Sequence, residues 1–456
     1  MQIISPLRMQ RPAMIARLAR PMMRPGIWTS LCGGLLAVSA CHGVLDASDP
    51  TRVLDSDIAN AAGANSRRLY VSFVFGRGFG STVTDVALFS DETKIDGRGQ
   101  AIHNDLNRRD GPQYEIDNTS VGHVSTQDPH LGTLDAIVTA ADVAIPAIRA
   151  NTPDSLKGDF LAHVFAMSGT AVVQMAEDVC SGFPINHVSA ENNSVFGPPL
   201  TTDSALAYGV TQLDSALTYA HDSTQFRDLA SVVKGRALLD RGQYAAAAAA
   251  VANVATSFEF RGEGNNFAYE NPNRYDFGFD NIVTADSEGG NGLPFVSAHD
   301  PRVQNVNVGV SYFNAADSAY MTTKYTDYSD HIIIATGIEA RLIEAEAALN
   351  AGDPSWLTTL NTLRESIGLT DLSDPGTTSA QVDMLFRERA FWLYLTGRRL
   401  GDLRRLVRNY GRDPNTVFPV GPALPSGQYG PSTAIPFVFA TESVLNPYLT
   451  SGCTGP

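Results

Sequence analysis

Aromatic side chains gather near the middle of the chain, in a segment suited to binding a ligand by ring stacking. Residues 257–330 are rich in Gly, Pro, Asn and aromatic residues, which predicts long irregular loops with short strands. Aromatic rings can stack on the apolar faces of sugars, while nearby Asn and Asp side chains bond the hydroxyl groups. We expect at least half of these rings to fasten the loop to the rest of the protein instead. The candidate ligand-binding residues are Phe267, Tyr269, Tyr275, Phe277, Phe279, Tyr312 and Tyr320, with Phe313 beside them.

Sequence patterns that carry catalysis are missing. There is no H-E-x-x-H motif, no pair of C-x-x-C motifs and no G-x-S-x-G turn. The glycine-rich run 76–82 lacks the lysine of a phosphate-binding loop, so we interpret it as a turn. Acidic residues are plentiful, but nothing selects a pair for glycoside hydrolysis. We therefore expect no enzyme activity, no cofactor and no metal.

The histidines are dispersed and follow no metal-ligand spacing. We interpret them as ordinary surface or loop residues, with metal binding as the weaker alternative. They include His103, His123, His130, His163 and His187.

Helical periodicity accounts for most of the remaining chain. Two of the stretches contain a helix, a glycine break and a second helix, at 235–245 and 344–356, and both resemble tetratricopeptide hairpins. In such a unit a glycine, here Gly242 or Gly352, supplies the left-handed turn. The expected helical stretches are 56–79, 131–148, 153–179, 202–219, 226–254, 332–367 and 380–407, and long irregular loops are expected at 257–330 and 410–456.

The N-terminus resembles an export signal that ends in a bacterial lipobox. Five arginines and no acidic residue precede an apolar run from Gly26 to Ala40, which is too short for a membrane span. Val38-Ser39-Ala40-Cys41 then predicts lipid attachment at Cys41. The alternative is an ordinary secretory peptide that is cleaved near Ala40. We expect a signal peptide at 1–40, a flexible tether at 41–55 and one ligand-binding domain at 56–456.

The net charge of the chain argues against nucleic acid as a ligand. Loss of residues 1–40 would change the formal net charge from −15 to −20, because that segment holds five arginines and no acid. Such a surface disfavours binding to nucleic acid, which needs clustered Lys and Arg.

Beyond Cys41 only Cys180 and Cys453 remain. In an oxidising compartment these two could form a disulfide, and the alternative is two unpaired thiols.

Several motifs follow one another in a defined order along the chain. Lys324-Tyr325 leads into Glu339-Ala340-Arg341-Leu342-Ile343-Glu344-Ala345-Glu346-Ala347, and Asn361-Thr362-Leu363-Arg364 continues the pattern. The other segments are Leu88–Glu92, Asp300–Arg302, Arg387–Phe391, Gly397–Arg405 and Ile435–Leu449. Together these ordered motifs resemble those of the SusD/RagB family of surface lipoproteins. One position departs from the family pattern, since Thr396 stands where an acid is usual before Gly397.

The resemblance implies a mostly α-helical scaffold of tetratricopeptide-type hairpins with long loops and few short strands. It also implies a lipid-anchored outer-membrane protein that binds an oligosaccharide or peptide and delivers it to a TonB-dependent, SusC-like transporter. The alternative is a helical lipoprotein that acts as a protein assembly scaffold. The charged residues in 339–346 and 398–405 are interpreted as structural ion pairs between helices rather than as a catalytic acid and base.

Overall fold

The computed structural model describes residues 58–96, 109, 129–189, 193–221, 223–262, 282–325, 330–423, 427–437 and 446–455. The elements in these ranges belong to one compact unit, Leu54–Pro456. The signal segment 1–40, the tether 41–55 and Cys41 lie outside the described residues, so the expectations for them stay predictions.

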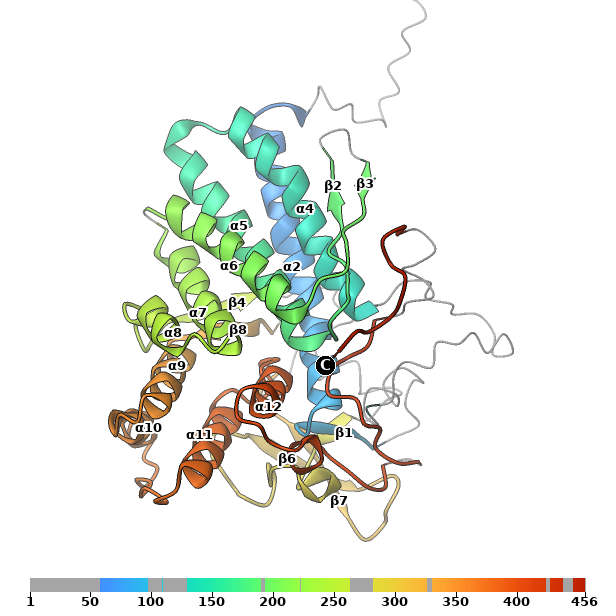
Figure 1. Cartoon of the computed structure of the whole chain (residues 1–456), viewed down its shortest axis with the longest axis vertical. Coiled ribbons are helices and arrows are strands. Elements are labelled where there is room, and N and C mark those ends of the chain that lie inside the picture. Colours follow the sequence, from blue (N-terminus) through green and yellow to red (C-terminus); the bar gives the residue numbers. More distant parts are fainter. Residues whose placement is uncertain are drawn as a thin grey trace, which may run out of the picture. The chain divides into compact units, whose positions relative to one another are not determined.

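Four long helices pack together in the first half of the chain (Figure 1). A Cβ atom at Gly209 of the fourth helix would lie only 2.7 Å from Cγ2 of Val173 on the third, so glycine permits their close approach. By length and composition, one described helical stretch, 130–151, could cross a membrane. Half of its most apolar window is buried inside the protein. The four helices are α2 (Ala61–Phe89), α4 (Pro129–Asn151), α5 (Asp154–Asp178) and α6 (Thr202–Tyr219).

The glycine-rich run 76–82 lies inside α2, so its interpretation as a turn is wrong. Its glycines serve helix packing. A Cβ atom at Gly78 would lie 3.1 Å from the carbonyl oxygen of Thr133 and 3.3 Å from Cδ1 of Ile137, both on α4. Glycine lowers helix propensity by about 1 kcal/mol relative to alanine. Here the close contact between α2 and α4 favours it nevertheless.

Helical hairpins follow α6 (Figure 1). The first joins α7 (Thr224–Asp240) to α8 (Tyr244–Val251), and the second joins α9 (Gly337–Asn350) to α10 (Ser355–Glu365). Gly242 and Gly352 have φ angles of 70° and 71°, in the left-handed region that favours glycine. The structure therefore confirms both predicted helix–glycine–helix units.

Two expected helical stretches are interrupted. The stretch 332–367 begins with strand β8 (Ile332–Thr336), where β-branched residues favour extended backbone. Thr336 then caps α9, because its Oγ1 accepts a hydrogen bond from the Glu339 amide at 3.0 Å. The stretch 380–407 divides into α11 (Thr378–Trp392) and α12 (Arg399–Arg408), and Gly397 adopts positive φ between them.

Short strands pair two by two, and every pair is antiparallel. The pairs are β1 (Thr93–Ile95) with β5 (Ile282–Thr284), β2 (His187–Val188) with β3 (Ser194–Val195), β4 (Glu259–Gly262) with β8, and β6 (Asn305–Val310) with β7 (Ser318–Thr322). A 3₁₀ turn at Glu288–Gly290 and the short helix α13 (Pro414–Val417) complete the described elements. The fold is thus mostly α-helical with few short strands, as predicted.

Apolar residues form two buried clusters. One lies among α2, α4, α5, α6 and α7 and includes Phe75, Phe79 and Leu213. The other lies among α9, α10, α11 and α12 and includes Leu360 and Leu385. Buried ion pairs connect the helices that surround these clusters.

Candidate ligand-binding site

The β6–β7 hairpin presents an aromatic ring to solvent. Tyr312, in the turn between the two strands, is 58% exposed. Its ring stands almost perpendicular to that of Phe313, with the centroids 5.1 Å apart. Phe313 is partly buried against the second apolar cluster, and Tyr320 is also partly buried. Of these three rings, Tyr312 is therefore the one best placed to stack on a ligand.

Asp96 holds the turn of this hairpin. This buried carboxylate accepts hydrogen bonds from the Ser311 hydroxyl at 2.6 Å and from the amides of Tyr312 and Phe313 at 3.0 and 3.4 Å. Asp96 directly follows β1, so a strand pair of the frame positions the turn. A turn whose backbone is held in this way loses little backbone freedom when its side chain binds a ligand.

Exposed valines extend the apolar surface of the hairpin. Val306, Val308 and Val310 all lie on β6 and are exposed. The other predicted stacking residues lie in the segment 263–281, outside the described residues, so their roles stay predictions: Phe267, Tyr269, Tyr275, Phe277 and Phe279.

The charged residues of the helices form ion pairs, which confirms their predicted structural role. Arg405 of α12 bonds both carboxylate oxygens of Glu346 on α9, at 2.7 and 3.0 Å. It also bonds Asp240 and Asp402, each at 2.8 Å. Burial raises the pKa of Asp402, but Arg389 and Arg405 more than offset this effect and lower the pKa to about 2.

A second buried network connects α5, α7 and α9. Arg236 bonds the two oxygens of Glu339 at 2.6 and 2.9 Å, and Arg398 bonds Glu177 at 3.1 Å. Burial raises the pKa of Glu177 well above its ordinary value, although Arg236 and Arg398 oppose this shift. Because these charged side chains are buried and paired with one another, they are poorly placed to react with a substrate.

The Lys324-Tyr325 pair holds the segment between α11 and α12. Lys324 donates to the carbonyl of Tyr394, and the Tyr325 hydroxyl donates to the carbonyl of Leu395 at 2.9 Å. Glu92 accepts a hydrogen bond from the Leu395 amide at 2.9 Å. Burial lowers the pKa of Lys324 to about 8 and raises that of Glu92 to about 8. Shifted pKa values can mark active sites, but here both side chains bond buried backbone.

Two histidines are buried, which corrects their interpretation as surface or loop residues. His130 of α4 lies between Asp85 and Asp178, with nitrogen–oxygen distances of 3.0 and 3.1 Å. His163 of α5 bonds Arg68 and Ser72. Each therefore connects helices rather than facing solvent.

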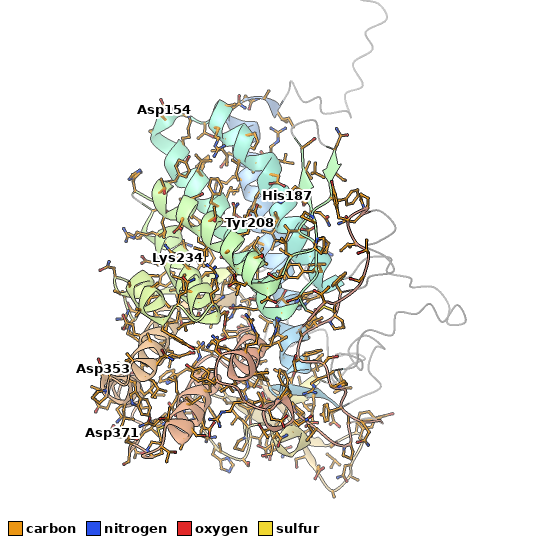
Figure 2. The ribbon with its side chains drawn as sticks, in the orientation of Figure 1. Asp154, His187, Tyr208, Lys234, Asp353 and Asp371 are labelled. Atoms are coloured by element: carbon orange, nitrogen blue, oxygen red, sulfur yellow. A yellow bond between two sulfur atoms is a disulfide. The ribbon has the colours of Figure 1, made fainter. Side chains whose placement is uncertain are left out.

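His187 is partly buried on β2, where its Nδ1 lies 2.9 Å from Asp142 and its ring stands edge-on to Tyr208. Figure 2 marks the positions of His187 and Tyr208. His103 and His123 lie outside the described residues. Within the described ranges, no group of three or more His, Cys, Asp or Glu side chains is arranged to hold a metal ion.

Cys180 and Cys453 form a disulfide, with their Cα atoms 5.5 Å apart. The sequence left this bond and two free thiols as alternatives. The bond joins the end of the α5 region to the C-terminal tail, across 273 residues of sequence. Backbone hydrogen bonds from Ser181 to Gly455 and from Thr454 to Ser181 run beside it.

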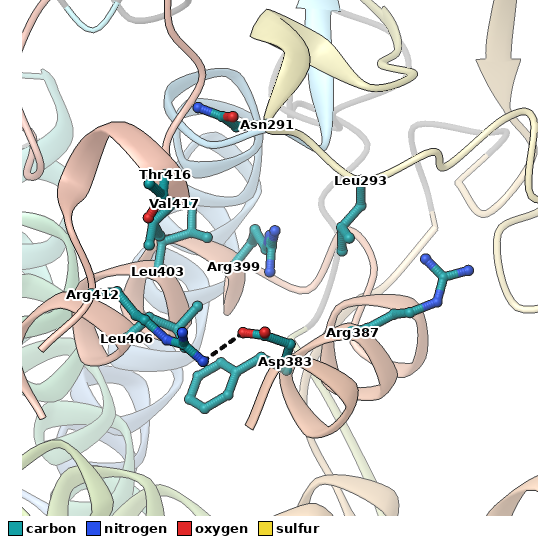
Figure 3. Close-up of a pocket in the computed structure, with 11 residues that line it drawn as sticks. Asn291, Leu293, Asp383, Arg387, Arg399, Leu403, Leu406, Arg412, Thr416 and Val417 are labelled. Carbon is teal, nitrogen blue, oxygen red and sulfur yellow. Dashed lines mark hydrogen bonds and ion pairs between the residues drawn. The ribbon is translucent and has the colours of Figure 1, made fainter. Parts of the chain in front are cut away.

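Residues near α11, α12 and α13 enclose a cavity of about 310 Å³ (Figure 3). The sequence offered no sign of it, because its walls come from distant segments and its arginines match the predicted ion-pair pattern. The residues that line the cavity come from α11, α12, α13, the segment before α13 and the loop at 291–293.

These features define a class of protein: a frame of paired helices, fastened by buried ion pairs, that carries a hairpin with an exposed ring. No protein-family model matches the chain, and no curated protein matches it. Solved structures do match, and the fold is that of the SusD-like proteins.

Three of these structures span nearly the same length as this chain. A SusD superfamily protein from Bacteroides thetaiotaomicron is 14% identical, with a TM-score of 0.61, and the match covers 86% of this chain and 99% of that one. A putative sugar binding protein from Bacteroides vulgatus is 15% identical, with a TM-score of 0.61 and coverage of 87% and 98%. Surface glycan-binding protein A from Bacteroides uniformis is 12% identical, with a TM-score of 0.59 and coverage of 88% and 99%. At these identities the likeness establishes the fold.

Proposed function

We propose that the protein is a non-catalytic, nutrient-binding protein that captures a glycan at the β6–β7 hairpin. The observation that carries the proposal is the position of Tyr312, an exposed ring whose backbone is fixed by buried Asp96. Solved proteins of the same fold include one titled a putative sugar binding protein and one titled a surface glycan-binding protein. The buried ion pairs use the charges of the described helices in the frame, which fits a binding role.

Delivery and anchoring extend the proposal. We infer that lipid attached to Cys41 holds the protein at the outer membrane and that it passes its ligand to a TonB-dependent, SusC-like transporter. The lipobox at 38–41 and the ordered SusD/RagB motifs support this inference. Two or more acyl chains would hold the protein stably on a membrane, because each buried methylene contributes about 0.8 kcal/mol. An oligosaccharide is the favoured ligand, with a peptide as the alternative.

Calorimetry with a panel of oligosaccharides and peptides tests the binding step. We expect an oligosaccharide to bind the wild type and Tyr312→Ala to weaken it about tenfold or more, because truncation of a central aromatic ring costs at least about 1 kcal/mol. Tyr448→Ala is the matched control, since Tyr448 is 56% exposed and lies outside the hairpin. Equal affinities for both variants and the wild type would remove Tyr312 from the site.

Membrane fractionation and co-purification test the remaining steps. Cys41→Ser should release the protein from the membrane fraction, and the wild type should co-purify with a large TonB-dependent barrel. Turnover of a glycan in the panel would refute the non-catalytic role. Failure of every glycan and peptide to bind would favour the assembly-scaffold alternative over nutrient binding.

A further inference from the structure

The cavity near α11, α12 and α13 contains a buried arginine with a spare donor group. Arg399 is only 6% exposed, and it lines the cavity (Figure 3). Its Nε and Nη2 atoms bond the two oxygens of Asp91 at 2.6 and 2.8 Å. Among the described residues, no acceptor bonds its remaining nitrogen, Nη1. Nη1 therefore keeps N–H groups available to bond an oxygen atom of a ligand in the cavity.

Two further arginines add positive charge at the cavity. Arg387 has no carboxylate within ion-pair distance among the described residues, and its guanidinium lies 4.5 Å from the centre of the Phe391 ring. Arg412 bonds Ser379 and Asp383, as the dashed line to Asp383 shows in Figure 3. The Asp383 side chain is largely exposed, so water screens its charge.

The charges at the cavity favour an anion. The lining contains three arginines and one aspartate, while Asp91 neutralises Arg399 from behind. One positive charge remains in surplus, in a chain whose formal net charge is −15. A guanidinium with free N–H groups is well suited to a planar carboxylate.

The other walls suit a ring with hydroxyl groups. Leu293, Phe386 and Leu403 provide apolar contacts. Asn291 donates through its Nδ2 to backbone carbonyls of Asn415 and Phe418, and no described donor bonds its Oδ1, which can accept from a hydroxyl. The volume of about 310 Å³ lies at the small end of the range for ligand pockets, on the order of 300–1,000 Å³.

We propose that this cavity binds a carboxylate-bearing sugar unit, with the carboxylate at Arg387, which has no acidic partner among the described residues, and the ring against the apolar wall. The choice of a saccharide rests on the proposed glycan-binding function. The carboxylate requirement rests on the arginines alone. The cavity would therefore select acidic glycans, while the hairpin supplies stacking that does not depend on charge.

Calorimetry of the wild type with galacturonic acid and with galactose tests the proposal. The two sugars differ only in the carboxylate, so we expect galacturonic acid to bind and galactose to bind at least tenfold more weakly. Arg387→Gln should reduce the affinity for galacturonic acid about tenfold, and Arg412→Gln should reduce it less. Arg227→Gln should leave it unchanged, because Arg227 is an exposed residue of α7 outside the cavity. Added salt should weaken the binding.

Several outcomes would overturn the proposal. Equal affinities for the two sugars, or an affinity for galacturonic acid that neither Arg387→Gln nor Arg412→Gln changes, would do so. Loss of that affinity in Tyr312→Ala but not in Arg387→Gln would move the acidic sugar to the hairpin. Equally strong binding of succinate would reject a saccharide site.

The two proposals fail in different ways. Neutral oligosaccharides that bind through Tyr312, without any binding of galacturonic acid, would overturn the cavity proposal and leave the glycan-binding function in place. No binding of any glycan would overturn both.

Discussion

Nε2 of His130 lies 3.1 Å from Oδ2 of Asp178, so a single buried histidine connects α4 to the end of α5. Burial lowers the pKa of His130, but hydrogen bonds to Asp178 and Asp85 more than offset this and raise it to about 10. The folded-state value exceeds the ordinary value of 6.5, so the protonated form stabilises the fold. This stabilisation is fully present below about pH 6.5 and is lost as the pH rises through about 10, with a size on the order of 5 kcal/mol.

The His130→Gln variant isolates this effect. Glu92 and Lys324 also titrate near pH 8, so the useful quantity is the difference in unfolding free energy between wild type and variant across pH 6–10. Denaturant unfolding should show that difference shrinking as the pH rises. His187→Gln is the control, because His187 is partly exposed and should show a smaller change. A difference that stays constant with pH would refute a charged His130.

The disulfide should stabilise the fold by restricting the unfolded chain. Cys453→Ser should lower the free energy of unfolding by about 2–5 kcal/mol, since the bond closes a long loop. Thermal unfolding with and without a reductant measures the effect. The reductant should lower the melting temperature of the wild type and leave that of Cys453→Ser unchanged. A wild type insensitive to reductant under unfolding conditions would argue against the bond.

Glu346 and Glu344 lie on the same helix but should differ sharply in their effect on stability. The Glu346 side chain is fully buried and bonds Arg405, so Glu346→Gln should cost about 1.5–3 kcal/mol by removing a charge-assisted pair of hydrogen bonds, while Asp240 and Asp402 still pair with the arginine. The Glu344 side chain is 28% exposed and pairs with Arg341, so Glu344→Gln should cost less than about 1 kcal/mol. Denaturant midpoints measure both. Similar losses for the two variants would mean that the buried pair contributes no more than the partly exposed one.

Two glycine-to-alanine changes should have opposite effects. A Cβ atom at Gly235 would lie 2.6 Å from Cγ1 of Val251, so Gly235→Ala should separate α7 from α8 and destabilise the fold by about 1–3 kcal/mol. A Cβ atom at Gly132 of α4 meets nothing within 4 Å, so Gly132→Ala should stabilise the fold by about 0.4–1 kcal/mol. Thermal unfolding of both variants checks the signs. A stabilising Gly235→Ala would show that α8 moves freely.

The periodic apolar pattern predicted most of the helices because packing and periodicity agree along them. The helical hairpins were also predictable, since Gly242 and Gly352 are chemical requirements of a left-handed turn. The glycine-rich run at 76–82 was wrongly predicted to be a turn, because propensities and loop signals report only the local sequence. The contact between Gly78 and α4, which lies more than fifty residues further along the chain, decided its structure.

The ion pairs could be anticipated as a type but not partner by partner. Nothing in the sequence indicates that Arg399 pairs with Asp91, about three hundred residues earlier, or that Asp96 holds the turn at Tyr312. The cavity could not be predicted from the sequence either, because its walls come from segments far apart along the chain. Its spare donor at Arg399 results from which nitrogens Asp91 occupies, and only the folded chain determines that.

Asp96 holds the hairpin turn chiefly by accepting hydrogen bonds from main-chain amides. These hydrogen bonds do not depend on which side chain stands at position 312, so the residue there can change while the turn keeps its backbone conformation. Under the proposed glycan-binding function, ligand preference can thus change by single substitutions at position 312 without a change of fold.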